Sequence, residues 1–142
     1  IELTNILPVS DSVLRARFRT GTTFQSTSYV GAGVQGSPVD APGGKTSGTT
    51  AIDVSGNAAF SVDSASSNGV DGIVIIKNPA STTKFKSLNI AVDHDNPSLN
   101  FTYHFGNGRY EGSALAVNGI QFFASTGNLL SGTINIYKTK IN

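Results

Sequence analysis

The residues best suited to chemistry lie in one run, Asp93-His94-Asp95-Asn96-Pro97. Two carboxylates and an amide oxygen are the hard ligands that Ca²⁺ prefers, which makes Asp93, Asp95 and Asn96 the candidate metal ligands. The run has neither the glycine nor the distal glutamate of an EF-hand loop. Because Asx residues before a proline commonly form turns, we favour a turn here and assign the chain no metal and no cofactor.

Candidate catalytic groups do not form a recognisable set. Glycosidases need two carboxylates that face each other across a sugar, but the only glutamates, Glu2 and Glu111, fall in separate expected strands. Serines are abundant, yet no Gly-x-Ser-x-Gly elbow stands between a strand and a helix. We therefore expect a protein that is not an enzyme, and keep polysaccharide degradation as an alternative.

Three arginines could form a binding surface. Arg15, Arg17 and Arg19 alternate with apolar residues, so their guanidinium groups share one face of a strand. Such a face could bind an acidic glycan or the carboxylates of a neighbouring subunit. Exposed arginines also discourage edge pairing while their stems cover apolar surface, and we favour this second interpretation.

Aromatic side chains offer another kind of contact. Tyr29 and Tyr110 could stack on sugar rings, and the sequence leaves open whether these two rings are exposed. Tyr103 alternates with Phe101 and Phe105 along one expected strand. This face is predicted to lie in the core, which places His104 on the solvent side.

Composition limits the remaining function classes. A chain of 142 residues fits one domain, residues 1–142. Because position 1 is not Met, the chain is either processed or part of something longer with an N-terminal segment before it. The net charge of +1 gives no electrostatic case for nucleic acid or an anionic membrane, and no apolar run is long enough for membrane insertion. The absence of cysteine excludes disulfides and thiolate metal sites. A charged fraction of 13% together with 16 glycines is typical of short strands joined by turns.

Alternating and apolar runs predict about ten short strands. The clearest covers residues 13–19, where Leu14, Ala16 and Phe18 face the core opposite the arginines. Consecutive apolar residues predict that 72–78 is a central strand buried on both faces. The other expected elements are strands at 51–54, 58–62, 85–92 with a bulge near Lys86, 99–105 and 110–116, and a hairpin turn at Gly106-Asn107-Gly108.

Two further segments complete this picture. Residues 31–50 contain several glycines and prolines but almost no bulky side chain, which predicts a long surface loop. The C-terminal segment carries two apolar runs, 120–123 and 133–137, around a glycine-bracketed link, and this predicts a closing pair of antiparallel strands. We expect Phe122, Ile134 and Ile136 of that pair to lie in the core.

Both ends of the chain resemble one family. Residues 1–21 give a strand, an apolar-Pro-x-Ser-Asp turn, and a strand of alternating apolar residues and arginines that leads to glycine. Residues 117–142 give an aromatic strand, then Ser-x-Gly-Asn-apolar-x-Ser-Gly-Thr, then an apolar strand ending in Tyr137. These patterns are similar to those of jelly-roll-like virion structural domains of tailed bacteriophages. Lys138 departs from the family, which usually has glycine after the tyrosine.

The resemblance implies an all-β fold, an antiparallel two-sheet β-sandwich of jelly-roll-like form. It also implies a place on the virion exterior, in a tail fibre, a knob or a capsid decoration, with a role in particle assembly and host-surface attachment. The implied partners are other virion proteins and further copies of the chain, as a homo-oligomer such as a trimer. The alternative is a carbohydrate-binding adhesin domain that presents loops at 31–48 and 93–98 to a host surface glycan.

Overall fold

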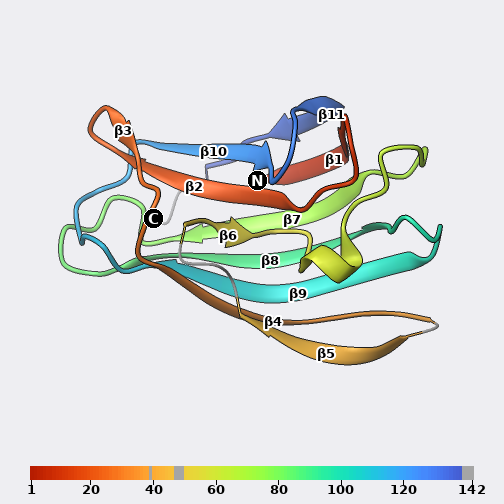
Figure 1. Ribbon diagram of the computed structural model, residues 1–142. Helices are drawn as coiled ribbons and strands as arrows, with labels where there is room; N and C mark the ends of the chain where they lie inside the picture. The colour runs from red at the N-terminus through yellow and green to blue at the C-terminus, as the bar shows by residue number, and fades with distance from the viewer. Residues whose placement is uncertain (39, 47–49, 139–142) are drawn as a thin grey trace.

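Two antiparallel sheets pack face to face in the computed structural model, which describes residues 1–38, 40–46 and 50–138 (Figure 1). This arrangement confirms the all-β, two-sheet sandwich that the sequence predicts, whereas a jelly-roll order of connections stays a prediction. The large sheet contains seven strands in the order β11 (Leu129–Asn135), β1 (Glu2–Pro8), β7 (Val70–Lys77), β8 (Lys86–Asp95), β9 (Phe101–Tyr110), β4 (Tyr29–Ser37) and β5 (Asp40–Thr46).

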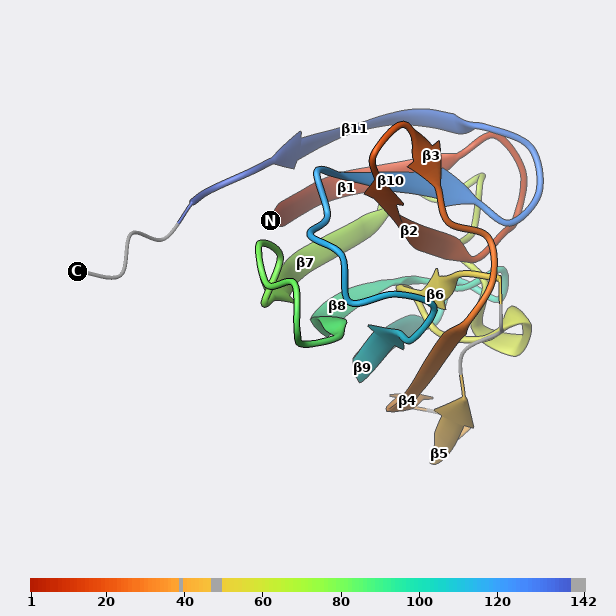
Figure 2. The same ribbon diagram turned by 90° about the vertical axis from the view of Figure 1, so that its left-hand side faces the viewer.

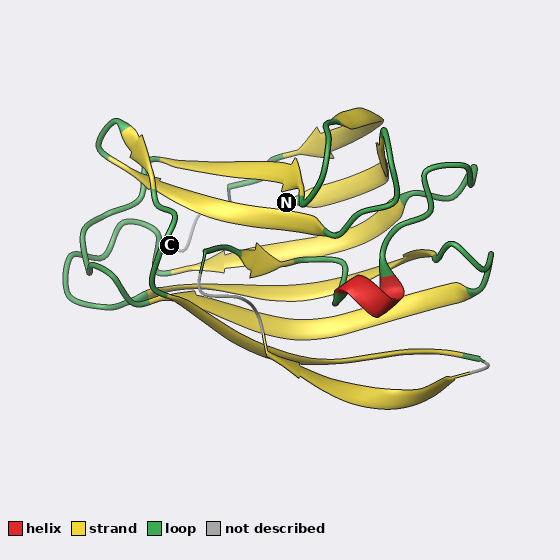
Figure 3. Cartoon of the chain, in the orientation of Figure 1, coloured by secondary structure: helices red, strands yellow, loops and turns green. Residues whose placement is uncertain are grey.

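The small sheet covers one face of the large sheet, as Figure 2 shows. Its strands are β10 (Gly119–Ala124), β2 (Leu14–Thr20) and β3 (Thr23–Phe24), with β6 (Ile52–Asp53) paired to the same edge of β2 as β3. Where a strand is expected at 58–62, residues Ala58–Phe60 form a single turn of 3-10 helix (Figure 3). The Asn57 side chain caps this turn by accepting a hydrogen bond from the Ala59 amide. None of the described residues belongs to a helix long and apolar enough to cross a membrane.

The core lies between the sheets and is built around β2. Leu14, Ala16 and Phe18 are at most 2% exposed, which confirms their predicted place. Across the interface they meet buried residues of the large sheet, among them Val74 of β7 and Leu88 of β8. The alternation of β2 therefore directs its apolar side chains against the large sheet, and this contact holds the two layers together.

The two C-terminal strands do not pair with each other. β10 pairs with β2 in the small sheet, whereas β11 pairs with β1 in the large sheet. The link between them therefore crosses from one layer to the other. Phe122 packs against the core, but Ile134 and Ile136 are 38% and 70% exposed, so their predicted burial was wrong. They lie on or beyond an edge strand that the small sheet does not cover.

The segment predicted as a long surface loop is a hairpin of β4 and β5. Ala32 pairs with Thr46, and Val34 pairs with Gly44. The strand β4 also pairs with β9 over most of its length. Backbone hydrogen bonds to two neighbours thus hold a sequence that lacks bulky side chains. Within this segment, residues 39 and 47–49 lie outside the described part of the chain.

The central strands also differ from the prediction. Ile73 and Ile75 of β7 are 54% and 53% exposed, so this strand is buried on one face only. The pairing of β8 is regular with β9 from Lys86 onward and with β7 from Ser87 onward, which excludes the expected bulge. The apparent change of phase arises because Phe85 precedes the strand, while Lys86 is its first buried residue.

Candidate functional site

The two faces of strand β9 are oriented opposite to the prediction from the sequence. Thr102 and His104 are buried, whereas Phe101 and Phe105 are 50% and 58% exposed. His104 points into the sandwich, and its Nδ1 lies 2.7 Å from the carbonyl oxygen of Val54, to which it donates. The predicted solvent position of His104 and the predicted burial of the phenylalanines were therefore both wrong.

The expected hairpin turn at Gly106-Asn107-Gly108 is part of the same strand. A Cβ atom at position 108 would come within 2.6 Å of Ile52 Cγ1, so a glycine is needed where β6 crosses β9. Small residues on this inner face let β6 approach closely. Three aromatic side chains of β9, Phe101, Tyr103 and Phe105, lie on the other side of the sheet, while His104 and Tyr110 face inward.

That other side is the outer face of the large sheet, turned away from the small sheet. Alternate residues of β7, β8, β9 and β4 form four rows across it. The acidic row contains Asp71, Asp93 and Tyr103. One central row contains Ile73, Ala91, Phe105 and Val34, and the other contains Ile75, Asn89, Asn107 and Ala32. The basic row contains Lys77, Ser87, Arg109 and Val30.

The central rows expose apolar side chains in adjoining positions. Phe105 pairs with Val34 on one side and with Ala91 on the other, and Ala91 pairs with Ile73. Val34 is 47% exposed, and Tyr103 lies beside Phe105 with 5.6 Å between ring centroids. Soluble monomers rarely expose continuous apolar patches of this kind, so the outer face has the character of a contact surface.

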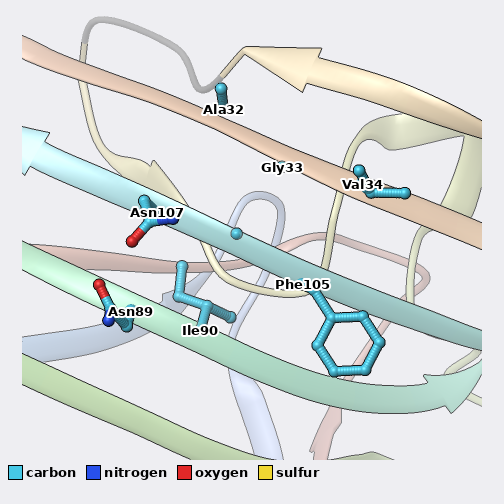
Figure 4. A pocket seen from close by; sticks show the side chains of 8 residues that line it. Ala32, Gly33, Val34, Asn89, Ile90, Phe105 and Asn107 are labelled. Atoms are coloured by element: carbon cyan, nitrogen blue, oxygen red, sulfur yellow. The ribbon is translucent and has the colours of Figure 1, made fainter.

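A shallow hollow of about 560 Å³ lies over the middle of this face (Figure 4). Asn89 and Asn107 are directly paired on neighbouring strands, and Phe105, two residues before Asn107 in β9, lines the same hollow. Within the described residues, neither amide side chain has a hydrogen-bond partner. The hollow thus offers an aromatic ring and two free amides, without charge.

The outer face is charged oppositely at its two ends. Asp71 and Asp93 are directly paired in the acidic row, and Asp95 follows in the same strand. Lys77 is exposed at the other end, where the Arg109 guanidinium lies 5.6 Å from the Phe85 ring centroid and pairs with Glu111. Like charges directly opposite each other destabilise a sheet, so the acidic row costs folding stability unless something offsets it.

Burial raises the pKa of the Asp93 carboxyl above its ordinary value of 3.8, and the charge of Asp71 raises it further. A carboxyl with a raised pKa binds a proton more readily in the folded protein than in the unfolded chain. Its contribution to stability is therefore complete below the ordinary pKa and is lost as the pH rises through the raised pKa.

We expect Asp93→Asn to raise the midpoint of thermal unfolding at pH 7 by about 1 to 2 °C, and to change it much less near pH 3. The substitution removes a charge that the folded protein disfavours only when it is ionised. Scanning calorimetry of both proteins at the two pH values measures the difference. A lower midpoint for the variant at pH 7 would contradict this electrostatic account.

The candidate metal ligands occupy a turn and the strand before it. The Asn96 side chain is buried and accepts hydrogen bonds from the backbone amides of Ser98 and Asn100, at 3.0 and 3.1 Å. The Asp95 carboxylate accepts hydrogen bonds from Ser66 and Asn68 instead, each at 2.8 Å. In the part of the chain that the structure describes, no cluster of three or more His, Cys, Asp or Glu residues could hold a metal ion.

The three arginines share one face of β2, on the side away from the core, but each has a partner within the chain. Arg15 forms an ion pair with Asp53 at 2.8 Å. Arg17 lies over the ring of Phe123, with 4.4 Å from Cζ to the ring centroid. Arg19 donates from Nε to the Asn118 side chain at 3.1 Å. These contacts tie β2 to its neighbours and leave a less open surface than three free cations would.

Neither Tyr29 nor Tyr110 can stack on a sugar from its present position. Tyr29 is 1% exposed and Tyr110 is 4% exposed, with 5.2 Å between their ring centroids. The Tyr29 hydroxyl accepts a hydrogen bond from the Phe18 amide at 2.8 Å and donates one to the Gln25 carbonyl at 3.2 Å. Burial raises the pKa of Tyr29 to about 12. Both rings therefore belong to the core.

Comparison of the chain with family models, curated proteins and solved structures finds no match. The sequence does not reveal the outer face, because either of the two alternating sets of residues in β9 could form the buried face. The glycines at 106 and 108, on the same side as His104, were the signal for close packing on that side.

Proposed function

We propose that this chain is an exterior structural module of a tailed-phage virion, and that it contacts neighbouring subunits through the outer face of its large sheet. The observation that carries this proposal is the joint exposure of Phe105, Ile73, Ile75 and Val34. Burying one such side chain gains roughly 1.5 to 3 kcal/mol when it is covered fully. A partner that covers the outer face would therefore be bound by ordinary hydrophobic contact.

The sequence resemblance supports the virion part of the proposal. The residues that carry it, 1–21 and 117–142, include the whole of β1, β2, β10 and β11, which supply two strands to each layer. The rows of the outer face come instead from residues 30–109, between the matching ends. The chain thus combines a scaffold similar to that of the family with a contact surface of its own.

The proposal is tested on particles of the phage that encodes the chain. Particles are purified through a density gradient, washed at high salt, and analysed by quantitative mass spectrometry. We expect the chain at a fixed number of copies per particle. If it is found in the lysate but is absent from washed particles, the virion proposal fails.

The hollow between Phe105, Asn89 and Asn107 favours a second candidate, a carbohydrate-binding adhesin domain. Aromatic rings stack on the apolar faces of sugars, and amides donate to and accept from hydroxyl groups. A glycan array containing host polysaccharides tests this candidate, with Asn107→Ala as the binding variant and Gln121→Ala on β10 as its control. No binding to any polysaccharide would leave the architectural role alone.

The polysaccharide-degrading alternative requires a pair of acids. Glu111 pairs with Arg109, and Glu2 accepts hydrogen bonds from Tyr137 and Asn135 at the opposite side of the sheet. An assay for reducing ends released from host capsule tests this alternative directly. Sustained release by the purified chain would displace both binding functions.

A further inference from the structure

The charges on the outer face form a pattern that matches a reversed copy of itself. The acidic row, with Asp71 and Asp93, lies on one side of the two central rows, and the basic row, with Lys77 and Arg109, lies on the other. The central-row residues of β7, β8, β9 and β4 are uncharged, and Glu2 of β1 continues the row of Ile73 at its edge. A surface with opposite charges at its two ends is complementary to the same surface turned end for end.

Two identical sheets that stack face to face can be related by a two-fold axis in the plane between them. If that axis ran along the strands, each row would face its own copy, and Asp71 and Asp93 would meet the aspartates of the partner. If the axis runs across the strands, the order of the rows is reversed. The acidic row of one copy then faces the basic row of the other.

We propose that the partner of the outer face is a second copy of this chain, stacked on it with its strands reversed. This inference rests on the proposed function, in which the outer face is the contact surface. Placing the axis between the two central rows sets Asp71 opposite Lys77 of the other copy, and Ile73 opposite Ile75. It also places Tyr103 over Arg109 of the other copy, a pairing suited to a cation–π contact.

The area available is sufficient for a specific dimer. Strands about 4.8 Å apart, with about seven residues along each strand at about 3.4 Å per residue, give roughly 600 Å² for the outer face of β1, β7, β8, β9 and β4. Two copies would bury about 1,200 Å² in total, which is at the lower end of stable protein interfaces. We therefore expect a dimer that dissociates in the micromolar range.

The test uses two single variants that carry opposite charge changes. Asp71→Lys places a lysine at both ends of β7 on the outer face, and Lys77→Asp places an aspartate at both ends. In a homodimer of either variant, both copies of the Asp71–Lys77 contact become repulsive. In a mixed dimer of the two variants, both contacts join opposite charges again.

Sedimentation equilibrium of the purified chain gives the dissociation constants. We expect the dimer of each variant to be about tenfold weaker than the native dimer or more, and the equimolar mixture to return near the native value. Asp71 also accepts a hydrogen bond from the Asn5 amide at 3.0 Å, so thermal unfolding is recorded for each chain. Recovery on mixing cannot come from repair of the fold, because the same chains are used.

Three results would overturn the inference: a native chain that stays monomeric at 100 µM, variants that dimerise like the native chain, or a mixture no tighter than its components. A tighter dimer for Asp71→Lys would point to the axis along the strands. A monomeric chain that still joins the particle through its outer face would refute self-association and leave the proposed function standing.

Discussion

Replacing Phe105 with lysine should prevent the chain from joining the particle while leaving its fold intact. Phe105 is 58% exposed and lies in the middle of the outer face, paired with Val34 and Ala91. A lysine ammonium group at the centre of a buried interface would lose its water without gaining a partner. Substitutions of central interface residues commonly cost about 2 kcal/mol or more of binding free energy. Incorporation should therefore fall by roughly thirtyfold or more.

The matched control is Leu115→Lys. Leu115 is 62% exposed, but it lies in the connection between β9 and β10, away from the rows of the outer face. Both variants are expected to unfold within about 1 kcal/mol of the native chain, since each changes an exposed side chain. Equal incorporation of the Phe105→Lys and native chains would show that the outer face is not the contact surface.

Replacing Lys86 with alanine should produce a large loss of stability. Lys86 is fully buried, and its Nζ donates to the carbonyl oxygens of Ser81, Lys84 and Ala114, at 2.6, 2.7 and 2.8 Å. Burial lowers the pKa of its ammonium group, and the three carbonyls offset that cost of desolvation. Without the donor these carbonyls lose their shared partner, so we expect about 3 kcal/mol of destabilisation.

Two further variants separate hydrogen bonding from packing at this site. Lys86→Met keeps much of the buried stem but has no donor, so it should lose nearly as much stability as Lys86→Ala. Lys84→Ala removes an exposed lysine next to the site and should change the free energy of unfolding by about 0.5 kcal/mol or less. Denaturant titration followed by circular dichroism measures all three. A Lys86→Met protein as stable as the native chain would refute the role of the three carbonyls.

The strands that sequence alone could place are those whose two faces differ in charge. In β2, arginines mark the solvent side, so Leu14, Ala16 and Phe18 could only face inward. Pairing partners were harder, because they depend on segments far apart in the chain. Nothing within the two C-terminal runs shows that β10 joins β2 while β11 joins β1.

The candidate site was missed for a related reason. Along β9, both alternating sets contain residues that could be buried, and the alternation alone favours the aromatic set as the core. The close approach of Ile52 and Val54 decides otherwise, because it needs Gly108 and gives His104 a buried acceptor. Likewise, β4 and β5 are held by neighbouring backbones rather than by their own side chains.

The most direct test of the central claim places a photoreactive benzoylphenylalanine at position 105 or at position 115, and irradiates the assembled particle. The outer face predicts a crosslink from position 105 to a virion protein, which includes a second copy of this chain, and little or none from position 115. Mass spectrometry of the crosslinked peptides identifies the partner. Crosslinks from position 115 alone would contradict the claim that the outer face of the large sheet is the contact surface.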